Sequence, residues 1–239
     1  MHKSGLPISS GETQMARSTS RIAAVPADRR PSRRRSSDAR DRILRTADRL
    51  FYSEGVHAVG VKRVVEEANV TQVTLYRHFP SKDELISAYL QGRADYDRDQ
   101  VLGLVDAYPD DPRRALTEMA TVLTDDDFAA MKRGCPFINA AAEFTGGHPA
   151  RVQAAEHRAW VAAQIEILLV RLEHRNPAAA SQQLMMLRTG AVVSAALDNN
   201  SDLNSHFLAC WNQLIDDGLP THPAPPDAVR GDGPLEGNR

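Results

Sequence analysis

The stretch that decides the fold is VVEEANVTQVTLYRHF, residues 64–79. Its first part continues an apolar pattern with the spacing of one helix face, formed by Val61, Val64, Val65 and Ala68. Asn69 follows, and asparagine tolerates the left-handed backbone conformation in which many helices end. Thr71 can then accept a hydrogen bond as the N-cap of a second helix. The stretch therefore predicts two short helices joined by a tight turn, the layout of a DNA-reading helix-turn-helix.

Helices are also predicted on both sides of this motif. Upstream, an apolar helix face ends at Gly55, a residue type that commonly ends helices. The members of that face are Ile43, Leu44, Ala47, Leu50 and Phe51. Downstream, Ser81 and Glu84 have the S-x-x-E spacing of a capping box, which marks the start of another helix. The sequence therefore predicts a head of three helices and a fourth helix that joins the head to the rest of the chain.

The region as a whole resembles the tetracycline-repressor (TetR) family of transcription regulators. The resemblance is carried by Ile43-Leu44, Leu50-Phe51, Gly55, Ala68-Asn69-Val70-Thr71, Thr74-Leu75-Tyr76, His78-Phe79 and Ser81-Lys82-Asp83-Glu84-Leu85. The chain departs from the family at Asn69, Val73 and Gly60, where the family usually has Gly, a small residue, and Thr or Ser. The resemblance implies an all-α fold, with a helix-turn-helix DNA-binding domain over residues 37–90 and a helical effector-binding and dimerisation domain over residues 91–217.

Composition agrees with a helical protein. Hydrophobic residues make up 42% of the 239 residues and aromatic residues only 5%, which suits helices packed with Ala, Leu and Val. No alternating run of the strand type and no Asn-Gly hairpin occurs. Neither an apolar run long enough for a bilayer nor a signal-peptide core is present. Because Cys135 and Cys210 also fit a reducing compartment better than a disulfide scaffold, we expect a cytoplasmic protein without membrane contact.

Charge is distributed unevenly along the chain. Residues 1–90 contain 16 Lys and Arg against 10 Asp and Glu, a formal charge of +6. The remaining residues contain 13 against 21, a formal charge of −8. This asymmetry indicates that the amino half meets a polyanion and the acidic remainder does not. Ordinary scatter of charge is the alternative explanation.

Both ends of the chain are predicted to be disordered. Residues 1–36 are rich in Ser, Arg and Pro and lack an apolar period. Their arginines could contact phosphates or enter a minor groove, or the arm could be a solvated tail. Residues 218–239 are rich in Pro and Gly and form a second predicted tail. The folded part is therefore expected to span residues 37–217.

The candidate DNA contacts lie on and around the second helix of the motif. The cap and first turn of that helix, which are expected to enter a major groove, are Thr71, Gln72, Val73 and Thr74. Lys and Arg neutralise phosphates, and Tyr and His can donate hydrogen bonds to them. The expected backbone contacts are therefore Lys62, Arg63, Tyr76, Arg77, His78 and Lys82. The alternative for Tyr76 and His78 is that they only pack the domain. Together these residues predict binding to double-stranded operator DNA.

The stretch RGCPFINAAAEF, residues 133–144, resembles one that surrounds the effector cavity in a subset of the TetR family. The resemblance implies a pocket for a small apolar effector, with apolar walls and few polar groups. Its expected lining residues are Met119, Leu123, Met131, Cys135, Phe137, Asn139, Phe144 and Trp160. A filled helical core would use the same residue types. Asn139 and Glu143 lie one helical turn apart, so either could be the pocket's polar group, or both could be a solvated or core-capped pair.

Two long helices are expected over about residues 150–174 and 178–199, separated by Asn176-Pro177. By resemblance they match the helix pair that forms the family's dimer, which packs with its mate as a four-helix bundle. Small residues on the second helix would allow close approach of a second copy: Gly190, Ala191, Ser194 and Ala195. A homodimer would place two heads on a palindromic DNA site. The alternative is that these faces are used entirely inside one chain.

Other kinds of chemistry have little support in the sequence. The histidines show no metal-ligand spacing, and neither a Gly-rich phosphate loop nor a convergent catalytic group is present, so we expect no enzyme activity, metal or cofactor. Cys135 could be a redox-sensing thiol, although most lone cysteines are packing residues. The sequence is interpreted as a ligand-responsive transcription regulator, a repressor that its effector releases from a palindromic operator. The alternative is a helical redox or ligand sensor that acts mainly through protein partners.

Overall fold

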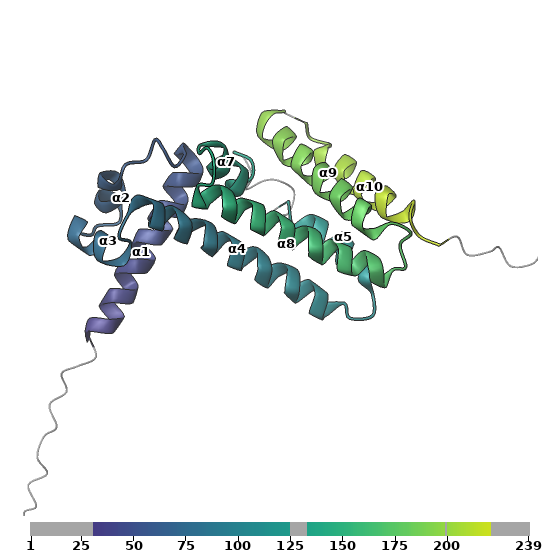
Figure 1. Ribbon diagram of the computed structural model, residues 1–239, viewed down its shortest axis with the longest axis horizontal. Helices are drawn as coiled ribbons and strands as arrows, with labels where there is room; N and C mark the ends of the chain where they lie inside the picture. Colours follow the sequence, from purple (N-terminus) through teal and green to yellow (C-terminus); the bar gives the residue numbers. More distant parts are fainter. Residues whose placement is uncertain (1–30, 125–132, 199, 221–239) are drawn as a thin grey trace, which may run out of the picture.

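The computed structural model describes residues 31–124, 133–198 and 200–220, with side chains within these ranges from Asp38 onward. All regular elements in these ranges are α-helices, as the sequence predicts. The molecule is elongated, with a small head of three helices at one end and a larger helical body beyond it (Figure 1). Met131, one of the expected pocket residues, lies outside the described residues.

The head consists of α1 (Pro31–Glu54), α2 (Val61–Glu67) and α3 (Gln72–His78). Their apolar faces meet in one core of buried side chains, which includes Ile43, Ala47, Leu50, Val64 and Leu75. Gly55 follows α1 with a φ of +99°, and Asn69 follows α2 with a φ of +51°. Both turns therefore have the left-handed backbone that the residue types predict.

Helix α1 starts earlier than the sequence predicts. Residues 31–36, which the sequence predicts to be part of a disordered arm, form the first turns of this helix. Proline suits the first position of a helix because its missing N–H needs no partner there. An apolar period marks only helix faces that pack on a core, and residues 31–37 contain no large apolar side chain. The prediction of disorder is therefore wrong for this segment.

Helix α4 (Lys82–Ala107) joins the head to the body. Ser81 caps its start by accepting a hydrogen bond from the Glu84 amide at 3.1 Å, at the predicted capping position. The helix packs against α1 in the head and continues into the body, where it packs against α5 and α8 (Figure 1). Its buried residues, from Leu85 to Val101, form part of one continuous core. A single helix thus belongs to both parts of the molecule.

The body contains five described helices: α5 (Pro112–Val122), α7 (Pro136–Ala142), α8 (Pro149–Arg171), α9 (Pro177–Leu197) and α10 (Leu203–Asp216). The first four begin with proline, whose preset φ favours the first helical position. Helix α8 packs on α4, α5, α7 and α9 and so lies at the centre of the body. Trp211 of α10 is fully buried and donates its indole N–H to the Leu116 carbonyl at 3.0 Å, which fixes α10 against α5.

Large apolar side chains remain exposed on two of the body helices. On α8 and α9 they are Val152, Ile167, Val170, Met186, Val193 and Leu197. Ala191, which the sequence predicts to face a second copy, is buried within its own chain. The outward face of α9 is therefore not the one centred on Ala191. Among the described helices, none has the length and hydropathy that a membrane crossing requires.

Candidate functional site

Helix α3 presents its first turn to solvent. Its N-cap Thr71 accepts a hydrogen bond from the Thr74 amide at 3.1 Å, and the two hydroxyl oxygens are 2.8 Å apart. Leu75 has no exposed surface and holds the helix against the head core, whereas Val73 is 80% exposed. Gln72 is exposed beside Val73. A capped and exposed first turn is the part of a helix-turn-helix that contacts base edges.

The two predicted phosphate contacts on α2 differ in how firmly they are held. Lys62 is exposed, and its ammonium lies 3.8 Å from the Glu66 carboxylate. Arg63 pairs with Glu67 at 2.9 Å and also with Glu54 of α1. The hydrogen bond to Glu67, together with Glu54, raises the pKa of Arg63. Arg63 therefore links α2 to α1 and would have to leave these partners to bind a phosphate.

The second half of α3 contains both exposed and enclosed side chains. Tyr76 is 41% exposed and Arg77 is also exposed, so both can reach DNA. His78 is half-buried, and its Nε2 has no hydrogen-bond partner among the described residues. Burial, together with the positive charges of Arg77 and Arg40, lowers the pKa of His78 and keeps it uncharged at neutral pH. This environment fits packing better than a phosphate contact.

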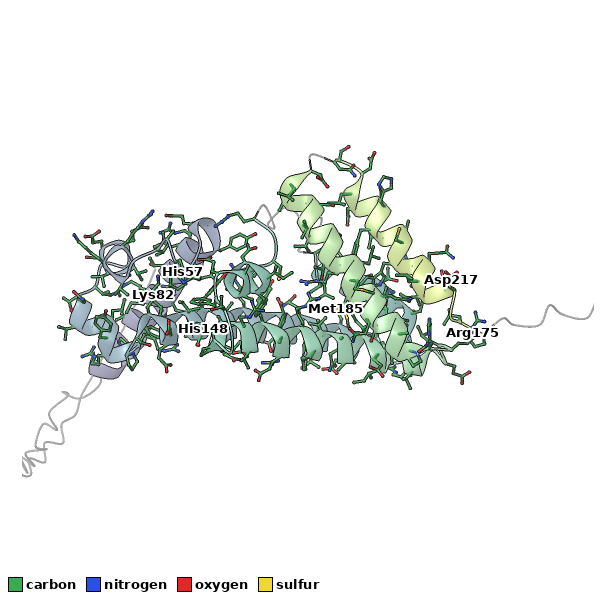
Figure 2. All side chains as sticks on the ribbon, turned by 45° about the horizontal axis from the view of Figure 1, so that its top comes forward. His57, Lys82, His148, Arg175, Met185 and Asp217 are labelled. Atoms are coloured by element: carbon green, nitrogen blue, oxygen red, sulfur yellow. The ribbon has the colours of Figure 1, made fainter. Side chains whose placement is uncertain are left out.

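Lys82 occupies the first position of α4, where free backbone amides favour an anion. Burial lowers the pKa of Lys82, and the carboxylates of Glu143 and Asp83 oppose that shift. Figure 2 shows Lys82 where the head meets the body, near His57 and His148. Lys82 is therefore a half-buried junction residue as well as a candidate phosphate contact.

Three of the predicted pocket residues line one small cavity in the body. Leu123, Cys135 and Phe137 enclose it together with Arg93, Tyr96, Asp97, Val122, Pro136 and Arg188. The cavity has a volume of about 30 Å³, which is room for roughly one water molecule. Arg188 is only 4% exposed and donates its Nε–H to the Leu123 carbonyl at 2.9 Å. The cavity is thus small, and the charged side chains of Arg93, Asp97 and Arg188 share its wall with apolar ones.

Two other predicted pocket residues are packing residues in the body. Met119 is fully buried in the core of α5. Trp160 is half-buried, and the Arg98 guanidinium lies 5.5 Å from the centre of its ring. Neither residue lines the cavity around Cys135. Residue type and helical period predict that these side chains face inward, but they do not distinguish a filled core from a cavity wall.

Asn139 and Phe144 also lie outside the cavity. Asn139 donates its amide N–H to the Arg133 carbonyl at 2.5 Å. Phe144 stacks on His148 with ring centroids 3.6 Å apart. Helix α7 ends at Ala142, so Phe144 belongs to the following loop and turns towards the head. Neither residue lines the cavity around Cys135, so their place in an effector pocket stays a prediction.

A larger groove of about 820 Å³ opens at the surface between α7, α8 and α9. Its lining includes Arg151, Arg158 and Met185, the last of which is labelled on α9 in Figure 2. The remaining lining on α8 consists mainly of small residues, Ala154, Ala155, Ala159 and Ala162. Sequence reasoning missed this groove. The run of alanines at helical spacing is the signal that could have predicted it, because small side chains leave space above a helix.

Titratable and sulfur-bearing side chains are dispersed through the body. Within the described ranges, no three potential metal ligands come together. Cys135 is buried, Cys210 is exposed, and both are free thiols. His157 is buried 3.0 Å from Asp97 and stacks on Phe137. This histidine therefore takes part in packing beside the cavity.

Comparison with known proteins decides the family. The family model described as bacterial regulatory proteins, tetR family, matches residues 43–89. The crystal structure of SCO4454, a TetR-family transcriptional regulator from Streptomyces coelicolor, has a TM-score of 0.71 and 36% sequence identity to this chain. The similarity covers 76% of this chain and 96% of that one. The chain belongs to the TetR family. It is accordingly a transcription regulator with a helix-turn-helix DNA-binding domain.

Further relatives place this TetR-family member in a wide group. The reduced form of E. coli NemR shares the fold, with a TM-score of 0.64 and 19% identity over 77% of this chain and 98% of that one. The transcriptional regulator YxaF of Bacillus subtilis is 45% identical over 49 residues, which are 20% of this chain and 26% of YxaF. The transcriptional activator FasR of Mycolicibacterium smegmatis is 37% identical over 68 residues, 28% of this chain and 31% of FasR. The chain thus spans only about a quarter to a third of the length of these two curated relatives.

Proposed function

We propose that this TetR-family protein represses transcription as a homodimer and leaves a palindromic operator when a small, mainly apolar effector binds its body. The observation that carries the DNA-reading part is the exposed and capped first turn of α3, with Gln72 and Val73 on its surface. Glutamine can bond to two groups of an adenine edge, and an apolar side chain can contact a thymine methyl. These two residues would read bases while Tyr76 and Lys62 bind phosphates.

The homodimer is supported by the apolar surface of α8 and α9. Met186 and Leu197 are 64% and 78% exposed, which is a large exposure for side chains of this type. Burying them against a second copy would be favourable and would form a four-helix bundle. A two-fold axis through that bundle would present two heads to successive major grooves, about 34–36 Å apart.

The effector site would develop from the cavity beside α7. Leu123 and Phe137 supply apolar walls, and the guanidinium of Arg188 could meet a single acceptor group of the effector. Because the cavity has a volume of only about 30 Å³, an effector would have to displace its walls, which couples binding to a change of conformation. Effector and DNA would then weaken each other's binding by the same factor.

The direction of regulation is a separate part of the proposal. An effector that removes a repressor from DNA switches its gene on, and this is the simplest use of a two-state dimer. FasR carries the name of an activator, so family membership alone leaves both directions open. A transcription assay therefore has to accompany the binding assay.

The test combines a gel shift on the DNA upstream of the protein's own gene with transcription in vitro from the same promoter. We expect a shift at protein concentrations that leave random DNA unbound, and less transcript when the protein is added. An increase in the amount of transcript would show that the protein is an activator and not a repressor. Equal affinity for both DNAs would contradict operator recognition, and a nuclease-treated pull-down would then examine the alternative of a sensor that acts through protein partners.

A further inference from the structure

The residue that follows α7 forms hydrogen bonds with backbone amides of the head. Glu143, the C-cap residue of α7, accepts a hydrogen bond from the Val56 amide at 2.9 Å and another from the His57 amide at 2.6 Å. The two bonds use different oxygens of the same carboxylate. Val56 and His57 belong to the turn between α1 and α2. One side chain of the body therefore forms hydrogen bonds with two consecutive backbone amides of the head.

The turn is shaped to receive this carboxylate. Gly55 has a φ of +99°, and a Cβ atom at this position would lie 2.9 Å from Oε1 of Glu143. A side chain there would therefore be strained by the backbone and would crowd the carboxylate. The Gly55 amide itself donates to the Phe51 carbonyl at 3.0 Å within the head. The Gly55 amide thus has its acceptor within the head, whereas the amides of Val56 and His57 have theirs in the body.

Aromatic rings close the same junction. Phe144 stacks on His148, with ring centroids 3.6 Å apart, and lies against His57 at 4.7 Å. His148 accepts a hydrogen bond from the Ala150 amide through Nδ1, and its Nε2 lies 3.8 Å from the Asp83 carboxylate at the start of α4. His57, Lys82 and His148 are seen together at this junction in Figure 2. The body therefore touches the head at the α1–α2 turn and at the first turn of α4.

Helix α7 is tied to the head at its other end as well. The Tyr52 hydroxyl of α1 donates to the Gly134 carbonyl at 3.1 Å, and Arg133 donates through Nη1 to the Tyr52 carbonyl at 3.0 Å. Arg151 of α8 also donates to the Ala141 carbonyl at 2.9 Å, which holds the end of α7 against α8. Seven helical residues span only about 10 Å. The residues just before this short helix thus form hydrogen bonds with the end of α1, and the residue just after it forms hydrogen bonds with the turn that follows α1.

The same helix forms a wall of the body cavity. Cys135 and Phe137, at the start of α7, face the cavity that Arg188 also lines. Glu143 lies about two turns further along the helix. A displacement of this wall would therefore move the Glu143 carboxylate and, with it, the amides of the head that are bonded to it.

We propose that Glu143 is a positioning residue that fixes the angle between the DNA-binding head and the body, through its hydrogen bonds to the amides of Val56 and His57. Helix α7 is the element that connects this contact to the cavity wall. The connection to an effector rests on the proposed function, whereas the positioning of the head does not. The two can therefore be tested separately.

The first experiment is amide hydrogen exchange at single-residue resolution on the full chain. In Glu143→Ala, the amides of Val56 and His57 should exchange at least roughly tenfold faster than in the wild type, because a charged acceptor has been removed from both. The Gly55 amide, bonded within the head, should be unchanged. Glu143→Gln retains one carbonyl oxygen and should protect only one of the two amides.

A matched control comes from the same body. Glu118 of α5 is a half-buried carboxylate that lies 3.8 Å from Arg114 and has no described contact with the head, so Glu118→Ala should leave both exchange rates at the wild-type value. Wild-type exchange at Val56 and His57 in Glu143→Ala would overturn the proposal. Faster exchange throughout the head, including Gly55, would also overturn it by showing that Glu143 stabilises the fold and does not position the head.

The second experiment measures the orientation of the head directly. Spin labels on Glu66→Cys in α2 and on the native exposed Cys210 of α10 report the distance from head to body within one chain, when labelled chains are diluted with unlabelled ones. We expect one narrow distance distribution in the wild type and in Glu118→Ala, and a broader or shifted one in Glu143→Ala. An unchanged distribution in Glu143→Ala would contradict the positioning role.

Neither readout requires DNA or an effector. If the protein shows no operator preference, the proposed function fails while exchange and distance still decide the role of Glu143. If operator binding is found and Glu143→Ala leaves exchange and distance unchanged, the positioning role fails alone. If Glu143→Ala shows both the faster exchange and the changed distance distribution, it should bind an operator with two half-sites more weakly than the wild type does. It should bind a single half-site about as well as the wild type.

Discussion

The head and the body differ in the large apolar side chains that they expose to solvent. Among the described residues of the head, the only exposed large apolar side chains are Val73 and Tyr76, and both lie on α3. The body leaves a series of them in solvent on α8 and α9. A head that is closed within one chain can present a polar, basic surface to DNA, whereas open apolar faces are better suited to a second protein surface. This difference fits recognition of DNA by the head and supports the proposed assembly of two copies through the body.

The largest expected effect is a loss of stability of the body, caused by substitution of Trp211. Trp211→Ala removes a fully buried ring and its bond to the Leu116 carbonyl, and should lower the free energy of unfolding by about 3–5 kcal/mol. Trp211→Phe keeps most of the buried ring and loses the hydrogen bond, so it should cost only about 0.5–1.5 kcal/mol plus a small cavity term. Denaturant unfolding of the full chain measures both. Equal losses in the two variants would show that packing of the ring contributes little.

A second change examines recognition by the head. Gln72→Ala should weaken binding to the operator by roughly 1–3 kcal/mol and should hardly affect binding to random DNA, because only a base contact is lost. Gln100→Ala, an exposed glutamine of α4 in the body, is the matched control. Fluorescence anisotropy on the two DNAs gives the four affinities. The same loss on operator and random DNA would mean that Gln72 reads no base.

A third change examines assembly by the body. Met186→Glu places a charge on the exposed apolar face of α9 and should weaken dimerisation by roughly tenfold, about 1.4 kcal/mol. Helical circular dichroism should be retained, since the side chain is 64% exposed within one chain. Leu102→Glu, at an exposed apolar residue of α4, should leave the dimer intact. Analytical ultracentrifugation would contradict the assigned face if both variants stayed dimeric.

The smallest effect concerns the junction between the two parts. Lys82→Ala should lower the slope of log affinity against log salt by about one per head if its ammonium binds a phosphate. The affinity at any one salt concentration should change less than in Gln72→Ala, and by a similar factor on operator and random DNA. Titrations at several salt concentrations supply the slope. A slope identical to that of the wild type would leave Lys82 as a junction residue only.

The same division explains how far the sequence predicts the structure. In the head the signals are local: Thr71 and Ser81 cap helices, and Asn69 takes the left-handed turn, as expected from each residue type alone. The start of α1 is missed because its first residues have no apolar side chain to form a period.

In the body the signals are ambiguous because they depend on contacts between distant segments. Ala191 and Met186 lie on one helix, and only packing shows that the first is buried in its own chain while the second is exposed. Phe144 is an aromatic residue near predicted pocket residues, yet the end of α7 at Ala142 turns it towards His148 and the head. The sequence allows Glu143 to be a polar pocket group or a member of a solvated or core-capped pair. Nothing in the sequence shows that its partners are backbone amides 86 and 87 residues away.

The most direct test of the central claim is a selection of random-sequence duplex DNA by the purified full-length protein. We expect enrichment of an inverted repeat whose half-sites lie one helical turn, or a whole number of turns, apart from centre to centre. Gln72→Ala should relax the preference at one position in each half-site. Recovery of DNA without any shared sequence, or of a single half-site without symmetry, would contradict the claim that a dimer of this chain reads DNA through the first turn of α3.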